Sequence, residues 1–149
     1  MKHYIALFLA VSTLLLVGCS VKTPEGLGMR DGRFAACAQG SNCVSSQATD
    51  EHHIAPIAAR GGLDVVMVDL ANAIESMFGS TVVVMDGPYL RAEFTSGVMR
   101  FVEDMECYYD QGRGVIEVRC ASRVGRIDVH ASRNRVEELR KVFTIRRSS

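Results

Sequence analysis

Residues 98–123 read VMRFVEDMECYYDQGRGVIEVRCASR, and this stretch decides the fold because two alternating strands flank one turn. Apolar residues recur at alternate positions in residues 98–110 and again in residues 115–123, which is typical of strands that bury one face. The turn at residues 111–114 holds two glycines, which reach positive φ without steric cost. The side chains predicted to face inward are Met99, Phe101, Met105, Cys107, Tyr109, Ile116, Val118 and Cys120.

The outward face of this hairpin is charged, and the placement of the charges selects its register. Pairing Asp110 with Val115 sets Glu106 across from Arg119, whereas a slip of two residues would set Asp110 across from Glu117. Opposed carboxylates disfavour the slip, so we predict the first register. The charges that then meet are Arg100, Asp104 and Glu106 on the first strand and Glu117, Arg119 and Arg123 on the second.

The same register bears on two cysteines. It places Cys120 opposite Met105 and leaves Cys107 as a diagonal neighbour, so a bridge between the two thiols would require the strands to shift. Two small buried thiols are therefore the favoured interpretation.

The rest of the chain predicts two helices and two further strands. A helix is expected over residues 63–78, capped by Asp64 and ended by Gly79, with the inward stripe Val65, Val68, Ala71, Ile74 and Phe78. Residues 81–85 predict a strand buried on both faces, and residues 89–95 predict an alternating strand. A closing helix begins at Ser132 or Asn134, with the inward residues Val136, Leu139, Val142 and Phe143. We expect an α+β domain, a mostly antiparallel sheet of four or five strands with both helices on its apolar face.

Length and charge indicate one domain whose parts pair with each other. The chain has 149 residues, of which 48% are hydrophobic, so one substantial core is expected. Residues 19–110 carry 6 Lys/Arg against 13 Asp/Glu, and residues 111–149 carry 10 against 4. We predict charge pairing between these parts, with a basic surface for an acidic partner or lipid as the alternative. Trp is absent and nothing favours a nucleic-acid partner.

Residues 1–18 have the pattern of a signal peptide. Their apolar run, Ile5 to Val17, is too short to span a membrane as a mature helix. It ends in Leu16-Val17-Gly18-Cys19, which resembles the lipobox of bacterial lipoproteins. That resemblance implies cleavage before Cys19 and a diacylglyceryl and acyl (palmitate-type) anchor on it, which would hold the protein firmly on a membrane. The alternative is an ordinary secretory signal with a chance cysteine.

The segment after Cys19 is expected to be a tether. The resemblance to bacterial lipoproteins, with Ser20 in the next position, implies the outer membrane, on its periplasmic face. The segment 19–31 contains Pro24, Gly26 and Gly28 and predicts a short linker, and residues 32–149 predict the single domain.

Cys37 and Cys43 lie six positions apart in a polar loop, and an exported protein allows them to form a disulfide. Three alternatives compete with it. A redox pair is disfavoured because the spacing is not Cys-x-x-Cys. A metal site with His52 and His53 is disfavoured because adjacent histidines do not readily face one ion, and a nucleophilic cysteine lacks a recognisable base. We therefore expect no metal site and no cofactor.

Several dispersed segments carry a family resemblance. They are residues 27–33 with Cys37, residues 42–46, 89–94 and 100–106, then residues 118–125 with Asp128, and residues 134–137. Together they resemble the bacterial and plastid domain-of-unknown-function family numbered 1499. The chain departs from that family's usual pattern at Ala38 and Ser41, where prolines are usual, at Cys120, where serine is usual, and at residues 130–132.

The resemblance implies one polar constellation but no established activity. Its residues are Asn42, Ser45, Arg91, Asp104, Glu106, Arg119, Ser122, Arg123, Asp128, Asn134 and Arg135. They suit one anionic or zwitterionic ligand, or else a structural ion-pair network that fixes loop and helix on the sheet.

Two functions remain open from the sequence. The first is a non-catalytic, lipid-anchored cell-envelope domain that binds an envelope protein or a small anionic ligand. The second is a small hydrolase or transferase acting on an anionic envelope substrate, with Asp104 or Glu106 as base and Arg119 and Arg123 holding the anion. We find no nucleophile–base pair and assign no catalytic residue.

Overall fold

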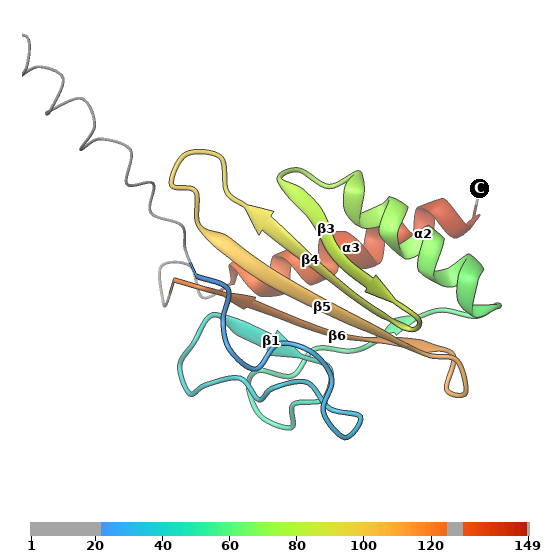
Figure 1. Ribbon diagram of the computed structural model, residues 1–149, viewed down its shortest axis with the longest axis horizontal. Coiled ribbons are helices and arrows are strands. Elements are labelled where there is room, and N and C mark those ends of the chain that lie inside the picture. The colour runs from blue at the N-terminus through green and yellow to red at the C-terminus, as the bar shows by residue number, and fades with distance from the viewer. Residues whose placement is uncertain (1–21, 125–129, 149) are drawn as a thin grey trace, which may run out of the picture.

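The computed structural model describes residues 22–124 and 130–148 (Figure 1). Within these residues six strands form one sheet, and two helices accompany it. The strands are β1 (Cys43–Ser45), β2 (Ile57–Ala58), β3 (Ser80–Asp86), β4 (Tyr89–Thr95), β5 (Val102–Asp110) and β6 (Val115–Ser122), and the helices are α2 (Leu63–Glu75) and α3 (Ala131–Ser148). The strand order is β1-β6-β5-β4-β3, with β2 also pairing with β6, and every one of these pairings is antiparallel.

The predicted α+β class with a mostly antiparallel sheet is confirmed. The described sheet has more strands than the four or five expected, because β1 and β2 were not predicted. These strands are three and two residues long, so neither is long enough to show an alternating pattern.

The predicted hairpin register is confirmed at each pair that was named. Asp110 lies opposite Val115, Glu106 opposite Arg119, and Met105 opposite Cys120. The opposed charges therefore selected the correct pairing. Cys107 and Cys120 are both free and buried, as predicted.

Both helices pack on the apolar face of the sheet, and the N-terminal segment lies on the other side (Figure 1). The inward residues of β4, β5 and β6 alternate as predicted. The core on this face includes Leu90, Ala92, Phe94, Met105, Cys107, Tyr109, Ile116, Val118 and Cys120 from the sheet, and Val66, Met67, Leu70, Ala73, Ile74, Val136, Leu139 and Phe143 from the helices.

The inward face predicted for the first helix was largely wrong. Val65 and Val68 are 58% and 50% exposed, whereas Val66 and Leu70 are fully buried. Residues 63–74 carry apolar side chains on two adjoining stripes, and the stripe that meets the sheet holds the larger side chains Met67 and Leu70. The helix begins at Leu63 as predicted, but the predicted cap was wrong, because the N-cap is Gly62 and no side chain caps the helix. The helix also ends earlier than predicted, at Glu75.

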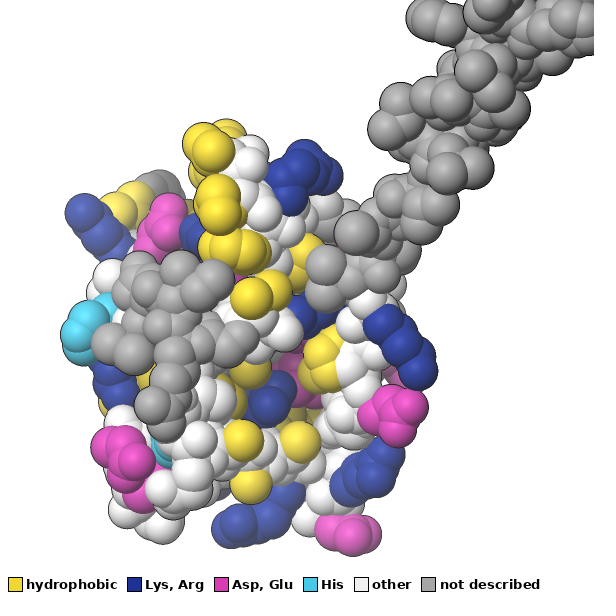
Figure 2. Space-filling model, turned by 90° about the vertical axis from the view of Figure 1, so that its left-hand side faces the viewer, with side chains coloured by type: hydrophobic (Ala, Val, Ile, Leu, Met, Phe, Trp, Pro, Cys, Tyr) yellow, Lys and Arg dark blue, Asp and Glu magenta, His cyan; other side chains and the backbone are white. Residues whose placement is uncertain are grey.

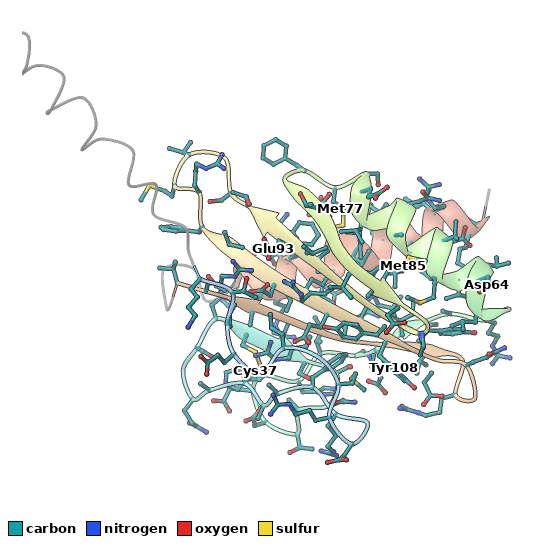
Figure 3. All side chains as sticks on the ribbon, viewed as in Figure 1. Cys37, Asp64, Met77, Met85, Glu93 and Tyr108 are labelled. Atoms are coloured by element: carbon teal, nitrogen blue, oxygen red, sulfur yellow. A yellow bond between two sulfur atoms is a disulfide. The ribbon has the colours of Figure 1, made fainter. Side chains whose placement is uncertain are left out.

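The strand predicted over residues 81–85 exists as β3 but is not buried on both faces. It is an edge strand that pairs with β4, and Val83, Val84 and Met85 are 44%, 38% and 48% exposed. Its pairing shifts between Val82 and Val84, an irregularity that blunts a sheet edge. Figure 3 shows Met85 on this strand.

The strand predicted from residue 98 begins later, at Val102. Residues 96–101 form a loop closed by a hydrogen bond from the Ser96 amide to the Phe101 carbonyl, 2.9 Å long. Arg100 adopts φ 52°, which ends the extended backbone, and Met99 is 66% exposed rather than inward.

No helix within residues 22–124 and 130–148 is long and apolar enough to cross a membrane. The predicted signal peptide, Cys19 and Asp128 lie outside the described residues.

Candidate functional site

The polar face of the sheet carries an ion-pair network centred on Asp104. This carboxylate is 1% exposed and accepts hydrogen bonds from Arg123 Nε at 2.7 Å, Arg123 Nη2 at 2.8 Å and Arg91 Nη1 at 3.1 Å. Both arginines also contact Glu93, at 3.0 Å from Arg91 and 2.5 Å from Arg123. Two guanidinium groups and two carboxylates thus neutralise one another on β4, β5 and the end of β6.

Within this network Arg123 is held in its charged form. Its hydrogen bonds to Asp104 and Glu93 raise the pKa of the guanidinium above the ordinary value, against the opposing effect of burial. Bonds between an ionised donor and an ionised acceptor are about twice as strong as neutral ones. Figure 3 shows Glu93 on the same face, towards the loop at residues 96–101.

Glu106 forms a second, adjacent group of contacts. Its side chain is fully buried, and Oε2 accepts from Arg119 Nη1 at 3.1 Å. Oε1 accepts from the Tyr89 hydroxyl at 2.9 Å and from the Gly28 amide at 2.6 Å. Burial, together with the Glu106 charge, raises the pKa of the Tyr89 phenol, so it stays a donor. The hydrogen bond from Gly28 fastens the segment predicted as a tether onto the sheet.

A third charged group lies at the turn between β5 and β6. Arg113 pairs with Glu117, which is 4% exposed, and the Ser46 hydroxyl donates to the same carboxylate at 2.5 Å. Ser46 Oγ also accepts from the Val118 amide at 2.8 Å. These contacts fix the chain after β1 against β6.

On the opposite face of the sheet, the buried carboxylate Glu103 on β5 contacts the start of α3. Glu103 accepts from the Ser132 hydroxyl at 2.8 Å and from Arg135 Nε at 3.4 Å. Asn42 joins the same group, because its side-chain oxygen accepts from the Ser132 amide at 3.2 Å. Arg135 also lies over the Phe94 ring, with the guanidinium carbon 4.7 Å from the centroid. This group anchors the first turn of α3 to β5 and to the residue before β1.

The constellation that the resemblance implied is therefore divided by the sheet. Arg91, Asp104, Glu106, Arg119 and Arg123 share the polar face, and Ser45 lies opposite Arg119 on β1. Asn42 and Arg135 belong to the group at the other face, the Ser122 hydroxyl donates to the Val124 carbonyl, and Asn134 is exposed on α3.

Several members of these groups were not predicted from the sequence. The residues are Glu93, Glu103, Tyr89, Gly28 and Ser132. The alternation of β4 places Glu93 on the same face as Arg91, so the sequence could have predicted that Glu93 belongs to this network. Glu103 and Met105 are two residues apart on β5, so both side chains point to the helix face of the sheet. The partners of Glu103 on α3 are 29 and 32 residues away in the sequence, so the alternation of the strand does not predict them.

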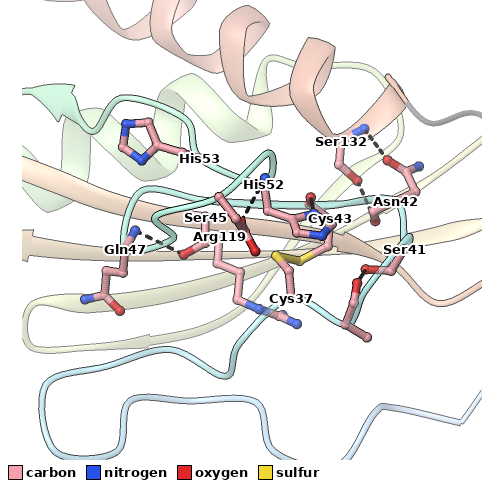
Figure 4. The surroundings of a disulfide bond; sticks show 12 residues. Cys37, Ser41, Asn42, Cys43, Ser45, Gln47, His52, His53, Arg119 and Ser132 are labelled. Atoms are coloured by element: carbon pink, nitrogen blue, oxygen red, sulfur yellow. Dashed lines mark hydrogen bonds between the residues drawn. A yellow bond between two sulfur atoms is a disulfide. The ribbon is translucent and has the colours of Figure 1, made fainter.

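The predicted disulfide is confirmed. Cys37 and Cys43 are joined, with an S–S distance of 2.06 Å and a Cα–Cα distance of 5.6 Å. Figure 4 shows Ser45, His52 and Arg119 around it. Since both sulfurs are joined to each other, neither is a thiolate available to a metal ion or a substrate.

His52 is buried beside this disulfide. Its Nδ1 lies 2.8 Å from the Cys43 carbonyl, which only accepts, so Nδ1 carries the proton (Figure 4). Among the described residues, no hydrogen-bond partner meets His52 Nε2 or Arg119 Nε. His53 points elsewhere, with its Nδ1 2.9 Å from the Ala48 carbonyl. The two adjacent histidines therefore contact different carbonyl groups, that of Cys43 in β1 and that of Ala48 in the loop after β1.

Two cavities border this architecture. One, of about 260 Å³, lies between the N-terminal loop and the segment after β1, lined by residues that include Phe34, Cys37, Ser45, Gln47 and Asp50. The other, of about 290 Å³, lies at the turn between β5 and β6 beside Arg60, Tyr109 and Arg113. Neither of these two cavities is lined by Asp104 or Glu106.

These features define an α+β domain with helices on one face of an antiparallel sheet and an arginine–carboxylate network on the other. A family model described as a protein of unknown function, DUF1499, matches residues 33–143. The chain belongs to this family, as the sequence resemblance predicted. A search of curated proteins finds no match.

Proposed function

We propose that this protein is a lipid-anchored component of a bacterial cell envelope whose α+β domain is a non-catalytic interaction module. The polar-face network then serves as a clamp that holds the N-terminal segment and the sheet together, close to the membrane that carries the anchor. The expected location is the periplasmic face of the outer membrane, and the expected partner is an envelope protein or a small anionic ligand.

The observation that carries the non-catalytic part is the burial of Asp104 and Glu106 together with the number of hydrogen bonds that each accepts. Each buried carboxylate receives three hydrogen bonds, and both oxygen atoms of each are used. A general base needs a free lone pair within reach of the proton that it removes. Of the roughly four lone-pair positions on each carboxylate, three are taken here by arginines, a phenol or a backbone amide, and each residue is at most 1% exposed to an incoming substrate.

Replacing Asp104 by Asn tests this part of the proposal. We expect the variant to lose stability and cellular abundance, and any envelope phenotype to follow abundance alone. The matched control is Glu137→Gln, which alters an exposed pair with Arg140 on α3. If Asp104→Asn folded at normal abundance and still abolished the phenotype, the carboxylate would have a chemical role and the hydrolase or transferase alternative would be favoured.

The anchoring part rests on the signal-peptide pattern and the lipobox-like residues 16–19. Intact mass and non-reducing peptide mapping of protein from washed membranes test it. We expect a triacylated peptide that starts at Cys19, together with a Cys37–Cys43 peptide pair. A peptide in which Cys19 is unmodified would refute the anchor.

A further inference from the structure

Three exposed apolar side chains gather at one end of the sheet. Phe78, Val98 and Met99 are 76%, 94% and 66% exposed. They come from two turns, one between α2 and β3 and one between β4 and β5. These turns adjoin, because a Cβ built on Gly97 would lie 3.8 Å from the Phe78 ring. We refer to Phe78, Val98 and Met99 as the apolar tip.

The apolar tip is held in place by hydrogen bonds. The Thr95 amide donates to the Gly79 carbonyl at 2.9 Å, which joins the two turns. The Phe101 amide donates to the Ser96 hydroxyl oxygen at 2.8 Å, which closes the loop from the other side. Gly79 is required for this approach, since at φ 77° a Cβ there would lie 2.3 Å from the Thr95 carbonyl oxygen. Adjoining exposed apolar side chains on turns held in place by hydrogen bonds are a candidate surface for contact with a membrane or another protein.

The apolar tip lies at the end of the molecule where the described chain starts, and this position determines how an anchored domain would be oriented on the membrane. The described part of the chain begins, where the trace turns from grey to blue, at the same end of the molecule as the loop between β4 and β5 (Figure 1). Cys19 is three residues before Lys22, the first described residue, and three extended residues span at most about 11 Å. An anchor on Cys19 would therefore hold this end of the domain against the bilayer.

The charge beside the tip suits the same surface. Arg100 follows Met99 directly and is exposed, and the Lys22 side chain is 86% exposed although it pairs with Glu25 at 3.5 Å. Figure 2 faces this end of the molecule and shows hydrophobic side chains gathered at its top, with Lys or Arg side chains beside them. Apolar residues flanked by basic ones are the pattern of a segment that enters the boundary between headgroups and acyl chains.

We propose that the apolar tip inserts into the surface of the bilayer that holds the Cys19 anchor, with Arg100 against lipid phosphates. The proposal rests on the proposed anchoring of Cys19 and adds to it a second contact, which fixes the orientation of the domain. An anchor alone would leave the domain free to turn on its linker. With the tip inserted, the turn between β5 and β6 at the far end of the sheet faces away from the membrane.

The absence of tryptophan from the chain allows a direct test. Val98→Trp places a single tryptophan at the tip, and Ile145→Trp places one at a 57% exposed position near the end of α3, at the far end of the molecule (Figure 1). Each full-length variant is purified from membranes and reconstituted into vesicles of phosphatidylglycerol and phosphatidylethanolamine, with plain or brominated acyl chains. We expect brominated chains to reduce the emission of the Val98→Trp variant at least about twofold and to leave that of the Ile145→Trp variant unchanged.

The outcomes separate the tip from the anchor. Adding Met99→Asp to the Val98→Trp variant should remove most of the quenching while the melting temperature stays the same, because Met99 is exposed. Equal emission of the Val98→Trp variant in both kinds of vesicle, in protein whose mass shows an acylated Cys19, would overturn the tip and leave the anchor standing. An unmodified Cys19 would overturn both. If the tip tryptophan were shielded in native membranes but unquenched in pure lipid, a protein would cover the tip and the lipid proposal would be wrong.

Discussion

The two faces of the sheet bury carboxylates in different ways. On the polar face, Asp104 and Glu106 each receive three hydrogen bonds, and the two arginines on Asp104 also share Glu93. On the helix face, Glu103 receives one hydroxyl and one longer contact from Arg135. The polar face therefore holds an interlocked network, whereas the helix face holds a local clamp on the first turn of α3.

This difference shows what each carboxylate does for the fold. The Asp104 group joins β4, β5 and the end of β6, and its members depend on one another because two arginines share two carboxylates. The adjacent Glu106 group joins the N-terminal segment to the sheet through Gly28. Arginine residues from the second part of the chain pair with carboxylates from the first part, namely Arg119, Arg123, Arg135 and Arg147 with Glu106, Asp104, Glu103 and Asp69. The predicted pairing between the oppositely charged parts is thus confirmed.

The largest expected effect is that of Asp104→Ala. It leaves Arg91 and Arg123 buried with one carboxylate, Glu93, between them, and breaking a buried pair costs about 3–5 kcal/mol. Urea unfolding measures the loss of stability. The control is Glu137→Ala, whose exposed pair with Arg140 should contribute less than about 1 kcal/mol. Equal losses for the two variants would contradict the interlocked network.

Glu103→Gln should have a smaller effect, about 1–2 kcal/mol, because the amide still accepts from Ser132 and only the charge on Arg135 loses its partner. The same unfolding experiment applies. Glu103 and Asp104 share no hydrogen-bond partner among the contacts described above, so in the double variant with Asp104→Asn the two losses should add within about 0.5 kcal/mol. A clear departure from additivity would mean that the two faces are coupled through β5.

Removing the disulfide with Cys37→Ser and Cys43→Ser should cost about 2 kcal/mol, since the bridge closes a short loop. The loss of local stability should be largest in the N-terminal loop that packs on the polar face of the sheet. Hydrogen exchange is expected to rise at Phe34, whose amide donates to Gln47, and to change little at Ser132 on the helix side. Uniform acceleration across both regions would show that the loop does not unfold by itself.

The sequence predicted the parts of this comparison that depend on local alternation. Strands β4 and β6, the inward face of β5 and the hairpin register follow from residues close in sequence and from opposed charges. The disulfide was predicted from the spacing of Cys37 and Cys43 and from the expectation that the protein is exported. The fold class could be predicted from these local patterns, and the family from the resemblance of the dispersed segments.

The errors share a physical cause, which is that tertiary packing chose between locally equal options. Helix α2 offers Val65 and Val68 or Val66 and Leu70 as its inward stripe, and only the sheet distinguishes them. The contact between Gly28 and Glu106 joins residues 78 apart, which no periodicity reports. The division of the candidate site into two groups depends on where α3 lies, and Asp128 stays a prediction.

The smallest expected effect concerns the thiols of the helix face. Burial, with the nearby Glu106 and Glu103 charges, raises the pKa of Cys107 and Cys120 above the ordinary 9.0. The folded state thus keeps these protons when the unfolded state loses them, so their contribution to stability is constant below about pH 8 and falls as the pH rises. The two thiols should together remove about 1 kcal/mol by about pH 9.

Thermal melting between about pH 7 and pH 10 measures this loss, and the Cys107→Ser, Cys120→Ser double variant should show a shallower alkaline decline. Tyr89 contributes a decline of the same sign that begins higher, because burial and Glu106 raise its pKa above the ordinary 10.0. That contribution belongs to the polar face and should persist in the double variant. If the double variant lost melting temperature with pH as steeply as the parent protein, the two thiols would not cause the alkaline decline. The decline would then be attributed to Tyr89 on the polar face.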